Sequence, residues 1–178
     1  MTGLTRSVTS GVAGALALTM IHETGRRVLA HAPRMDEVAM RGLRKLLPGK
    51  QRDPVRLHQL ALAGDLLSNS VYYSAIAAPT RTATWTRAAL LGTAAGFGAL
   101  LLPERLGLGV PPNADRRANQ FMTVAWYVSG ALAAAYVATR SFTSSSRAAG
   151  SSRAAPPPRA DAFHTRPRTL ASASDGAP

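Results

Sequence analysis

The stretch that decides the fold is residues 121–138, F-M-T-V-A-W-Y-V-S-G-A-L-A-A-A-Y-V-A, a continuous run of 18 residues without a charge. Residues 88–102, A-A-L-L-G-T-A-A-G-F-G-A-L-L-L, form a second such run. A helix of a soluble protein should show a polar face along its whole length, whereas both runs are apolar or small all round. Spanning hydrocarbon takes roughly 20 mostly apolar residues, so the pattern indicates a helical membrane protein rather than a soluble bundle.

Working outward from these runs, apolar blocks alternate with Pro and Gly along the first 140 residues. We predict an all-α fold: a four-helix transmembrane bundle with a short amphipathic interfacial helix and a disordered C-terminal tail. The predicted spans are about 7–29, 54–78, 84–102 and 116–139, and the amphipathic helix covers 35–47. Asp53-Pro54 is typical of a helix N-cap followed by proline at the first helical position, and Pro79 and Pro103 should end their blocks. Full insertion is left open for two spans. The uncharged core of span 7–29 is short, and span 54–78 carries several polar residues, including His58, Asp65 and Asn69.

Residues 141–178 change in composition to Ser, Ala, Pro and Arg. Such a segment buries too little apolar surface to offset its ordering entropy, so we predict a disordered tail after a membrane domain of residues 1–140. Within the spans, small residues repeat at four-residue spacing, as at Gly11 and Ala15 or Gly92 and Gly96. This spacing favours close helix packing, in a compact bundle or a homo-oligomer.

The charge is strongly positive, with 21 Lys and Arg against nine Asp and Glu and a net charge of +12. Nine of these basic residues lie between the uncharged parts of the first two spans, on and around the amphipathic helix. Such a concentration of positive charge is typical of a cytoplasmic loop on anionic headgroups. The candidate headgroup contacts are Arg34, Arg41, Arg44 and Lys45. The charge distribution favours both chain termini outside the cytoplasm. Nucleic acid is an unlikely partner because the basic tail lacks interleaved aromatic residues.

The chain has no Cys, which excludes disulfides, thiolate metal sites and a Cys nucleophile. The string H-E-T-G-R at residues 22–26 is not the H-E-x-x-H of zinc proteases, and no phosphate-binding or nucleophile-elbow motif occurs. We therefore expect no metal and no cofactor. We also expect no cleaved signal peptide, because the small-x-small site at residues 30–32 follows Arg26 and Arg27.

Ionisable residues inside spans are candidate functional sites, because leaving them in hydrocarbon is expensive. His22 and Glu23 lie at the end of the first span. Glu23 precedes Arg26 and Arg27 by three and four residues, so it can form an interfacial ion pair, or it can belong to a proton or cation site.

A second polar group lies on the predicted span 54–78, with His58, Asp65, Asn69 and Tyr72 along one helical stripe and Ser68 beside it. Asp65 would lie near mid-span, where a carboxylate must pair or stay protonated. It can fix the bundle by a hydrogen bond to a neighbouring helix, or it can act as a proton-coupled or substrate-binding carboxylate. Arg34 and Asp36, at the start of the amphipathic helix, can contact headgroups or cap that helix.

Several strings together resemble uncharacterised small polytopic proteins of bacterial membranes. They are I-H-E (21–23), A-P-R-M-D (32–36), G-D-L-L-S-N-S-V-Y-Y-S (64–74), L-P-E-R-L-G-L-G (102–109) and M-T-V-A-W-Y (122–127). The resemblance covers most of the first 140 residues and none of the tail. It implies a multi-pass protein of the bacterial inner membrane and carries no activity or catalytic residue.

Three functions remain open at this point. The first is a structural or interaction role in the membrane, without chemistry of its own. The second is a small proton-linked transporter that uses Asp65 with Asn69 and Glu23. The third is a membrane-embedded enzyme acting on lipid, for which the sequence shows no nucleophile and base pair.

Overall fold

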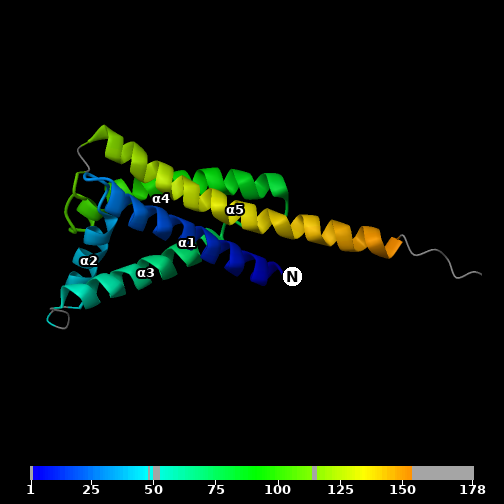
Figure 1. Cartoon of the computed structure of the whole chain (residues 1–178), viewed down its shortest axis with the longest axis horizontal. Helices are drawn as coiled ribbons and strands as arrows, with labels where there is room; N and C mark the ends of the chain where they lie inside the picture. Colours follow the sequence, from blue (N-terminus) through cyan, green and yellow to red (C-terminus); the bar gives the residue numbers. More distant parts are fainter. Residues whose placement is uncertain (1, 48, 50–52, 114–115, 154–178) are drawn as a thin grey trace, which may run out of the picture.

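The computed structural model describes residues 2–47, 49, 53–113 and 116–153, with side chains up to residue 140. These residues form five α-helices and no strand (Figure 1). The helices are α1 (Gly3–Val28), α2 (Met35–Leu46), α3 (Pro54–Ser74), α4 (Arg81–Arg105) and α5 (Arg117–Arg153). The predicted all-α fold is confirmed, and each predicted block corresponds to one helix.

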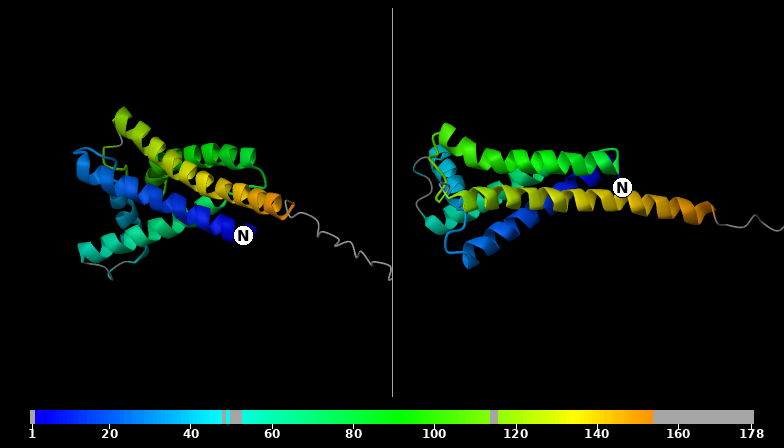
Figure 2. Two further views of the ribbon diagram at one scale, coloured as in Figure 1. Left: turned by 45° about the vertical axis from the view of Figure 1, so that its right-hand side comes forward. Right: turned by 90° about the horizontal axis from the view of Figure 1, so that it is seen from above.

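The four long helices alternate in direction, and α2 lies across one end of them (Figures 1 and 2). Hydrogen bonds from Arg41 to the Leu108 carbonyl and from Lys45 to the Leu106 carbonyl tie α2 to the connection between α4 and α5. We call this the α2 end of the bundle. The first residues of α1 and the connection between α3 and α4 lie at the opposite end (Figure 1).

The helix starts follow from local capping. The Thr2 hydroxyl accepts a hydrogen bond from the Thr5 amide, and the Thr80 hydroxyl accepts one from the Ala83 amide. The Asp53 carboxylate accepts a hydrogen bond from the Val55 amide at 3.0 Å, with Pro54 at the first helical position. Each cap satisfies a helix-end N–H that has no partner inside the helix. The predicted cap at Asp53 is confirmed.

Small residues form the seams between helices. A Cβ atom added to Gly14 of α1 would lie 2.8 Å from the Gly130 carbonyl oxygen of α5, and one added to Gly92 of α4 would lie 2.8 Å from Ala131 Cβ. The backbones therefore approach too closely for larger residues, as in helix pairs of membrane proteins. In this chain the small-residue spacing joins helices of one molecule.

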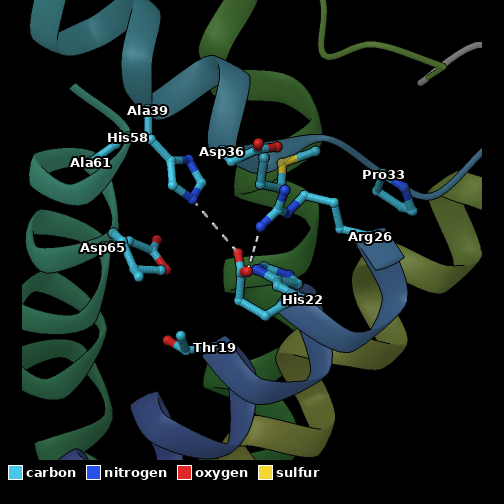
Figure 3. A pocket seen from close by; sticks show the side chains of 12 residues that line it. Thr19, His22, Arg26, Pro33, Asp36, Ala39, His58, Ala61 and Asp65 are labelled. Atoms are coloured by element: carbon cyan, nitrogen blue, oxygen red, sulfur yellow. Dashed lines mark hydrogen bonds and ion pairs between the residues drawn. The ribbon is translucent and has the colours of Figure 1, made fainter. Parts of the chain in front are cut away.

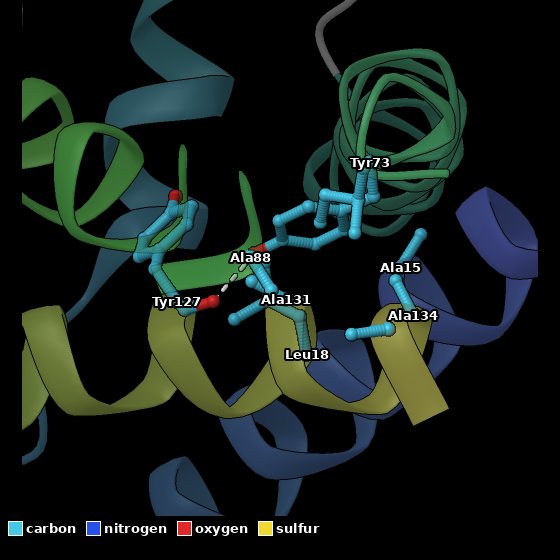
Figure 4. Close-up of a cluster of buried hydrophobic side chains, with 9 residues drawn as sticks. Ala15, Leu18, Tyr73, Ala88, Tyr127, Ala131 and Ala134 are labelled. Carbon is cyan, nitrogen blue, oxygen red and sulfur yellow. Dashed lines mark hydrogen bonds between the residues drawn. The ribbon is translucent and has the colours of Figure 1, made fainter. Parts of the chain in front are cut away.

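The buried cluster lies where α1, α3, α4 and α5 meet (Figure 4). It is built mostly from Ala, with Leu18, Tyr73, Ile76 and Tyr127 as its large members. The Tyr73 hydroxyl donates a hydrogen bond to the Tyr127 carbonyl at 2.9 Å, which links α3 to α5. The Tyr73 side chain is fully buried, and this hydrogen bond satisfies its hydroxyl group.

Three helices are long and apolar enough to cross a membrane: α1, α4 and residues Arg117–Arg140 of α5. Their apolar stretches agree with three of the four predicted spans. The helix α3, which carries His58, Asp65 and Asn69, does not reach the same hydropathy.

The helix boundaries differ from the prediction at several places. The helices α1 and α4 begin at Gly3 and Arg81, before the predicted starts at 7 and 84. The helix α3 ends at Ser74, four residues before the predicted end. The helix α4 continues through Pro103 to Arg105 because a proline in the last turn frees only one carbonyl, that of Ala99, from its helical N–H. The helix α5 runs to Arg153, through the first part of the predicted tail, which contains no proline before Pro156. The rest of the predicted disordered tail, 154–178, lies outside the described residues.

Candidate functional site

A polar cavity lies between α1, α2 and α3, in the half of the bundle near α2 (Figure 3). Its volume is about 30 Å³, enough for about two water molecules at roughly 10–15 Å³ each. The polar side chains that line it are Thr19, His22, Glu23 and Arg26 of α1, Asp36 of α2, and His58 and Asp65 of α3. The structure thus brings together the two polar groups that the sequence places on separate helices.

Glu23 is the charged centre of the α1 side. It forms the predicted ion pair with Arg26 and a second one, at 3.4 Å, with Arg27. Its other carboxylate oxygen lies 4.0 Å from His58 Nε2 of α3. This approach joins the α1 and α3 sides of the cavity.

Asp65 points from α3 into the same cavity (Figure 3). Its Oδ1 atom accepts a hydrogen bond of 2.9 Å from Asn69 Nδ2, and the same amide donates to the Asp65 carbonyl at 3.0 Å. No Lys, Arg or His nitrogen in the described part of the chain lies within 4.0 Å of the Asp65 carboxylate. Asp65 is therefore paired within its own helix, and the hydrogen bond to a neighbouring helix that the sequence also allows is not made.

Three polar atoms of residues that line the cavity, Thr19 Oγ1, His22 Nε2 and Arg26 Nε, are buried without a hydrogen-bond partner among the described residues. The imidazole of His22 is held between α1 and α5, with its ring centroid 5.2 Å from that of Trp126 and 5.6 Å from that of Tyr127. A buried donor or acceptor without a partner costs about 1–3 kcal/mol. The cavity therefore offers unused hydrogen-bonding capacity to water or to another small polar species.

Thr19 and Asp36 line this site but are not among the site residues predicted from the sequence, where Asp36 is expected at a helix cap or at headgroups. Arg34 is the residue before α2 and makes no side-chain cap there. Instead its guanidinium donates two hydrogen bonds to the Asp36 carboxylate, at 2.9 and 3.0 Å, and pairs with Glu37 at 3.2 Å. Burial alone would raise the pKa of Asp36, but the hydrogen bond and charge of Arg34, helped by the charge of Arg26, lower it below the ordinary value. The same pairing raises the pKa of Arg34.

The predicted stripe on α3 is divided between two sides of the helix. His58 and Asp65 line the polar cavity, whereas Ser68, Asn69 and Tyr72 line an open groove between α3, α4 and α5. The Tyr72 hydroxyl donates a hydrogen bond to the Leu91 carbonyl of α4 at 2.9 Å, and the Ser68 hydroxyl bonds only its own helix. The Asp65–Asn69 pair is the point where the polar cavity and this groove are adjacent.

The candidate headgroup residues also separate. Arg34 is engaged by Asp36 and Glu37, and Arg41 and Lys45 donate to backbone carbonyls of the connection between α4 and α5. Arg44 is exposed and has no bonded partner in the described part of the chain.

Among the described residues, no three His, Asp or Glu side chains come together in an arrangement that could hold a metal ion. Compared with known proteins, the chain matches no protein family, and neither a curated protein nor a solved structure is significantly similar to it. The site must therefore be interpreted from its own chemistry.

Proposed function

We propose that this chain is an integral membrane protein whose α1, α3, α4 and α5 cross the bilayer, with α2 at the cytoplasmic surface. The support is the distribution of side chains, which differs from that in a water-soluble bundle because many large apolar side chains are exposed while several polar ones are buried. Large apolar side chains such as Leu67, Leu90 and Phe121 are 68, 66 and 79 % exposed, whereas the polar Ser10, Thr84 and Thr123 are fully buried. Small and polar residues inside and large apolar residues outside are typical of helices packed in lipid.

The same distribution supports α3 as the fourth crossing helix despite its lower hydropathy. Beyond Gln59 its exposed face carries no charge and includes Leu60, Leu67 and Val71. Its polar residues Asp65 and Asn69 are turned inward, Asp65 to the cavity and Asn69 to 8 % exposure. A helix with polar residues facing its neighbours can cross a membrane at a mean hydropathy too low to identify it from composition.

We further propose that the polar cavity is a proton-binding centre, with Asp65 as the acceptor, and that the protein conducts protons across the membrane through it. The observation that carries this proposal is that Asp65, Glu23 and His58 share one cavity with three unpaired polar atoms. At about 30 Å³ the cavity admits water but not a metabolite. Water in the cavity would form a hydrogen-bonded path from Asp65 to the neighbouring Glu23 and His58 side chains, and from there through Asp36 to the α2 end of the bundle.

Proton flux into liposomes tests this proposal. Purified protein is reconstituted with a pH-sensitive dye inside, and a potassium diffusion potential drives protons inward. Wild type should acidify the interior, and Asp65→Asn should reduce the rate to that of empty liposomes. The new amide keeps an oxygen that can accept the bond from Asn69, so the variant should fold.

Ser68→Ala is the matched control, because Ser68 is exposed and its hydroxyl bonds only the Asp65 backbone carbonyl. This variant should keep the wild-type rate. The competing structural or interaction role predicts that wild type conducts no protons, and that Asp65→Asn alters assembly or abundance instead.

A further inference from the structure

The helices α3 and α4 follow one another in the chain but separate towards the α2 end (Figures 1 and 2). Between them lies the open groove, with a volume of about 430 Å³. On the α4 side the groove is lined by small residues such as Ala94 and Gly98 and ends at Leu102. The distance from Ala94 to Leu102 along the helix axis is about 12 Å. Tyr72 of α3 and Tyr127 of α5 also line it, and none of its lining residues carries a charge.

Two cations of α2 bind the backbone of the connection that lines the end of the groove near α2, although they are not lining residues themselves. Leu106 and Leu108 line this end, and their carbonyls accept hydrogen bonds from Lys45 Nζ at 2.8 Å and from Arg41 Nη1 at 3.2 Å. The connection can approach α2 because Gly107 and Gly109 adopt positive φ angles of 67° and 77°, which other residues rarely adopt. A side chain at Gly107 would also bring its Cβ to 3.0 Å from Lys45 Nζ.

Neutral carbonyls leave the positive charge of these cations in place. The nearest carboxylate of Arg41 is Glu37, at 3.8 Å, and Lys45 has no carboxylate within 4.0 Å in the described part of the chain. The groove therefore combines an uncharged channel with a positive end, where Lys45 has no carboxylate within 4.0 Å in the described part of the chain and Arg41 has only the long ion pair with Glu37. An anionic phospholipid is complementary to this pattern, because its acyl chains are uncharged and its headgroup is negative.

We propose that the groove binds one anionic phospholipid, with the phosphate at Lys45 and Arg41 and an acyl chain along Ala94–Leu102 of α4. The proposal rests on the membrane crossing argued above, because only then does the groove face acyl chains. A second copy of this chain is the competing occupant of the groove, but it would bring a further positively charged protein to Lys45 and Arg41, whereas a lipid phosphate is complementary to both cations.

Native mass spectrometry of the detergent-purified full chain tests the proposal by counting bound lipids during titration. The probes are phosphatidylglycerol and phosphatidylethanolamine with the same acyl chains. Wild type should hold one phosphatidylglycerol more tightly than any phosphatidylethanolamine. Lys45→Gln should weaken phosphatidylglycerol binding about five-fold, the equivalent of about 1 kcal/mol for one basic residue near a lipid surface, and leave phosphatidylethanolamine unchanged.

Two matched controls separate the site from general effects. Arg44→Gln removes the same charge from α2, away from any partner, and should leave the binding of the tight phosphatidylglycerol unchanged. Gly98→Leu should block the groove and weaken both lipids, since the Cβ at this position meets only the flexible Leu102 side chain at 3.4 Å. Gly64→Leu places the same residue on the open outer face of α3 and should bind like wild type.

Equal binding by Gly98→Leu and Gly64→Leu, or by Lys45→Gln and Arg44→Gln, would overturn the lipid site. A dimer that Gly98→Leu dissociates would assign the groove to a second copy and would also overturn it. Release of wild type from membranes by alkaline carbonate would instead refute the membrane crossing itself. The two failures are therefore distinguishable.

Discussion

The close approach of α4 and α5 gives a quantitative prediction for Gly92→Ala. An added Cβ would lie 2.8 Å from Ala131 Cβ and 2.9 Å from Val128 Cα. Carbon atoms are in optimal contact at about 3.5–4.0 Å, so the helices must separate by roughly 1 Å. Overpacking of this kind costs about 1–3 kcal/mol, and the second obstacle is backbone, which cannot rotate away.

Replacing glycine by alanine also stabilises a helix by about 1 kcal/mol, and this gain must be removed from the comparison. Gly64→Ala is the matched control, because nothing lies within 4 Å of a Cβ at that position of α3. Both variants gain the same helix propensity, but only Gly92→Ala separates two helices. We therefore expect Gly92→Ala to be less stable than Gly64→Ala by about 2 kcal/mol.

Equilibrium unfolding in mixed micelles with increasing dodecyl sulfate measures this difference. Trp85 of α4 and Trp126 of α5, the two tryptophans of the chain, report the separation of these helices by fluorescence. If Gly92→Ala proves as stable as Gly64→Ala, the helices do not pack at this distance and the proposed small-residue seam is incorrect.

Three further changes test other contacts. Tyr73→Phe should lower the free energy of unfolding by about 1 kcal/mol, because the hydrogen bond to the Tyr127 carbonyl is lost. Tyr136→Phe, at an exposed position, should leave the free energy of unfolding unchanged. The same unfolding assay compares the two variants, and equal effects would contradict the buried hydrogen bond. Glu23→Gln should destabilise by about 1–2 kcal/mol because Arg26 keeps its half-buried charge without a carboxylate, and a neutral result in that assay would mean that the ion pair is not formed. The pKa of Asp36 lies below its ordinary 3.8 in the folded protein, so its ionised form stabilises the fold above that pH and the contribution is lost as the pH falls further. The stability difference between wild type and Asp36→Asn, measured from pH 7 to pH 3, should therefore shrink only below about pH 4, and a constant difference would contradict the Arg34–Asp36 pair.

Local patterns predict the helices of this chain well. The alternation of apolar and charged residues gives the amphipathic helix as 35–47, against Met35–Leu46 in the structure, and Asp53-Pro54 marks the start of α3 correctly. The predicted end of α4 at Pro103 is wrong because the free-energy cost of a proline depends on its distance from the helix end, and the sequence alone does not give that distance. Residues 141–153 mislead because composition alone does not separate a helical extension from a disordered segment.

The site is predictable only in its parts. Spacing along one helix identifies the Glu23–Arg26 pair and places Asp65 and Asn69 within reach of each other. It cannot show that Asp36 joins them, because that depends on the angle at which α2 packs against α1 and α3. The division of the α3 stripe has the same cause, since different neighbours cover the two sides of this helix.

The central claim is that α3 crosses the membrane and carries Asp65 into it. The absence of native cysteine allows single cysteines to be placed at Leu47, Arg81 and Val110, three exposed positions in or beside the connections between the long helices. Labelling of intact bacterial cells with a membrane-impermeant maleimide then reports the side of each. The account predicts labelling at position 81 and protection at positions 47 and 110. Equal labelling of positions 47 and 81 would place both ends of α3 on one side, and would contradict both the four-span topology and the intramembrane position of Asp65.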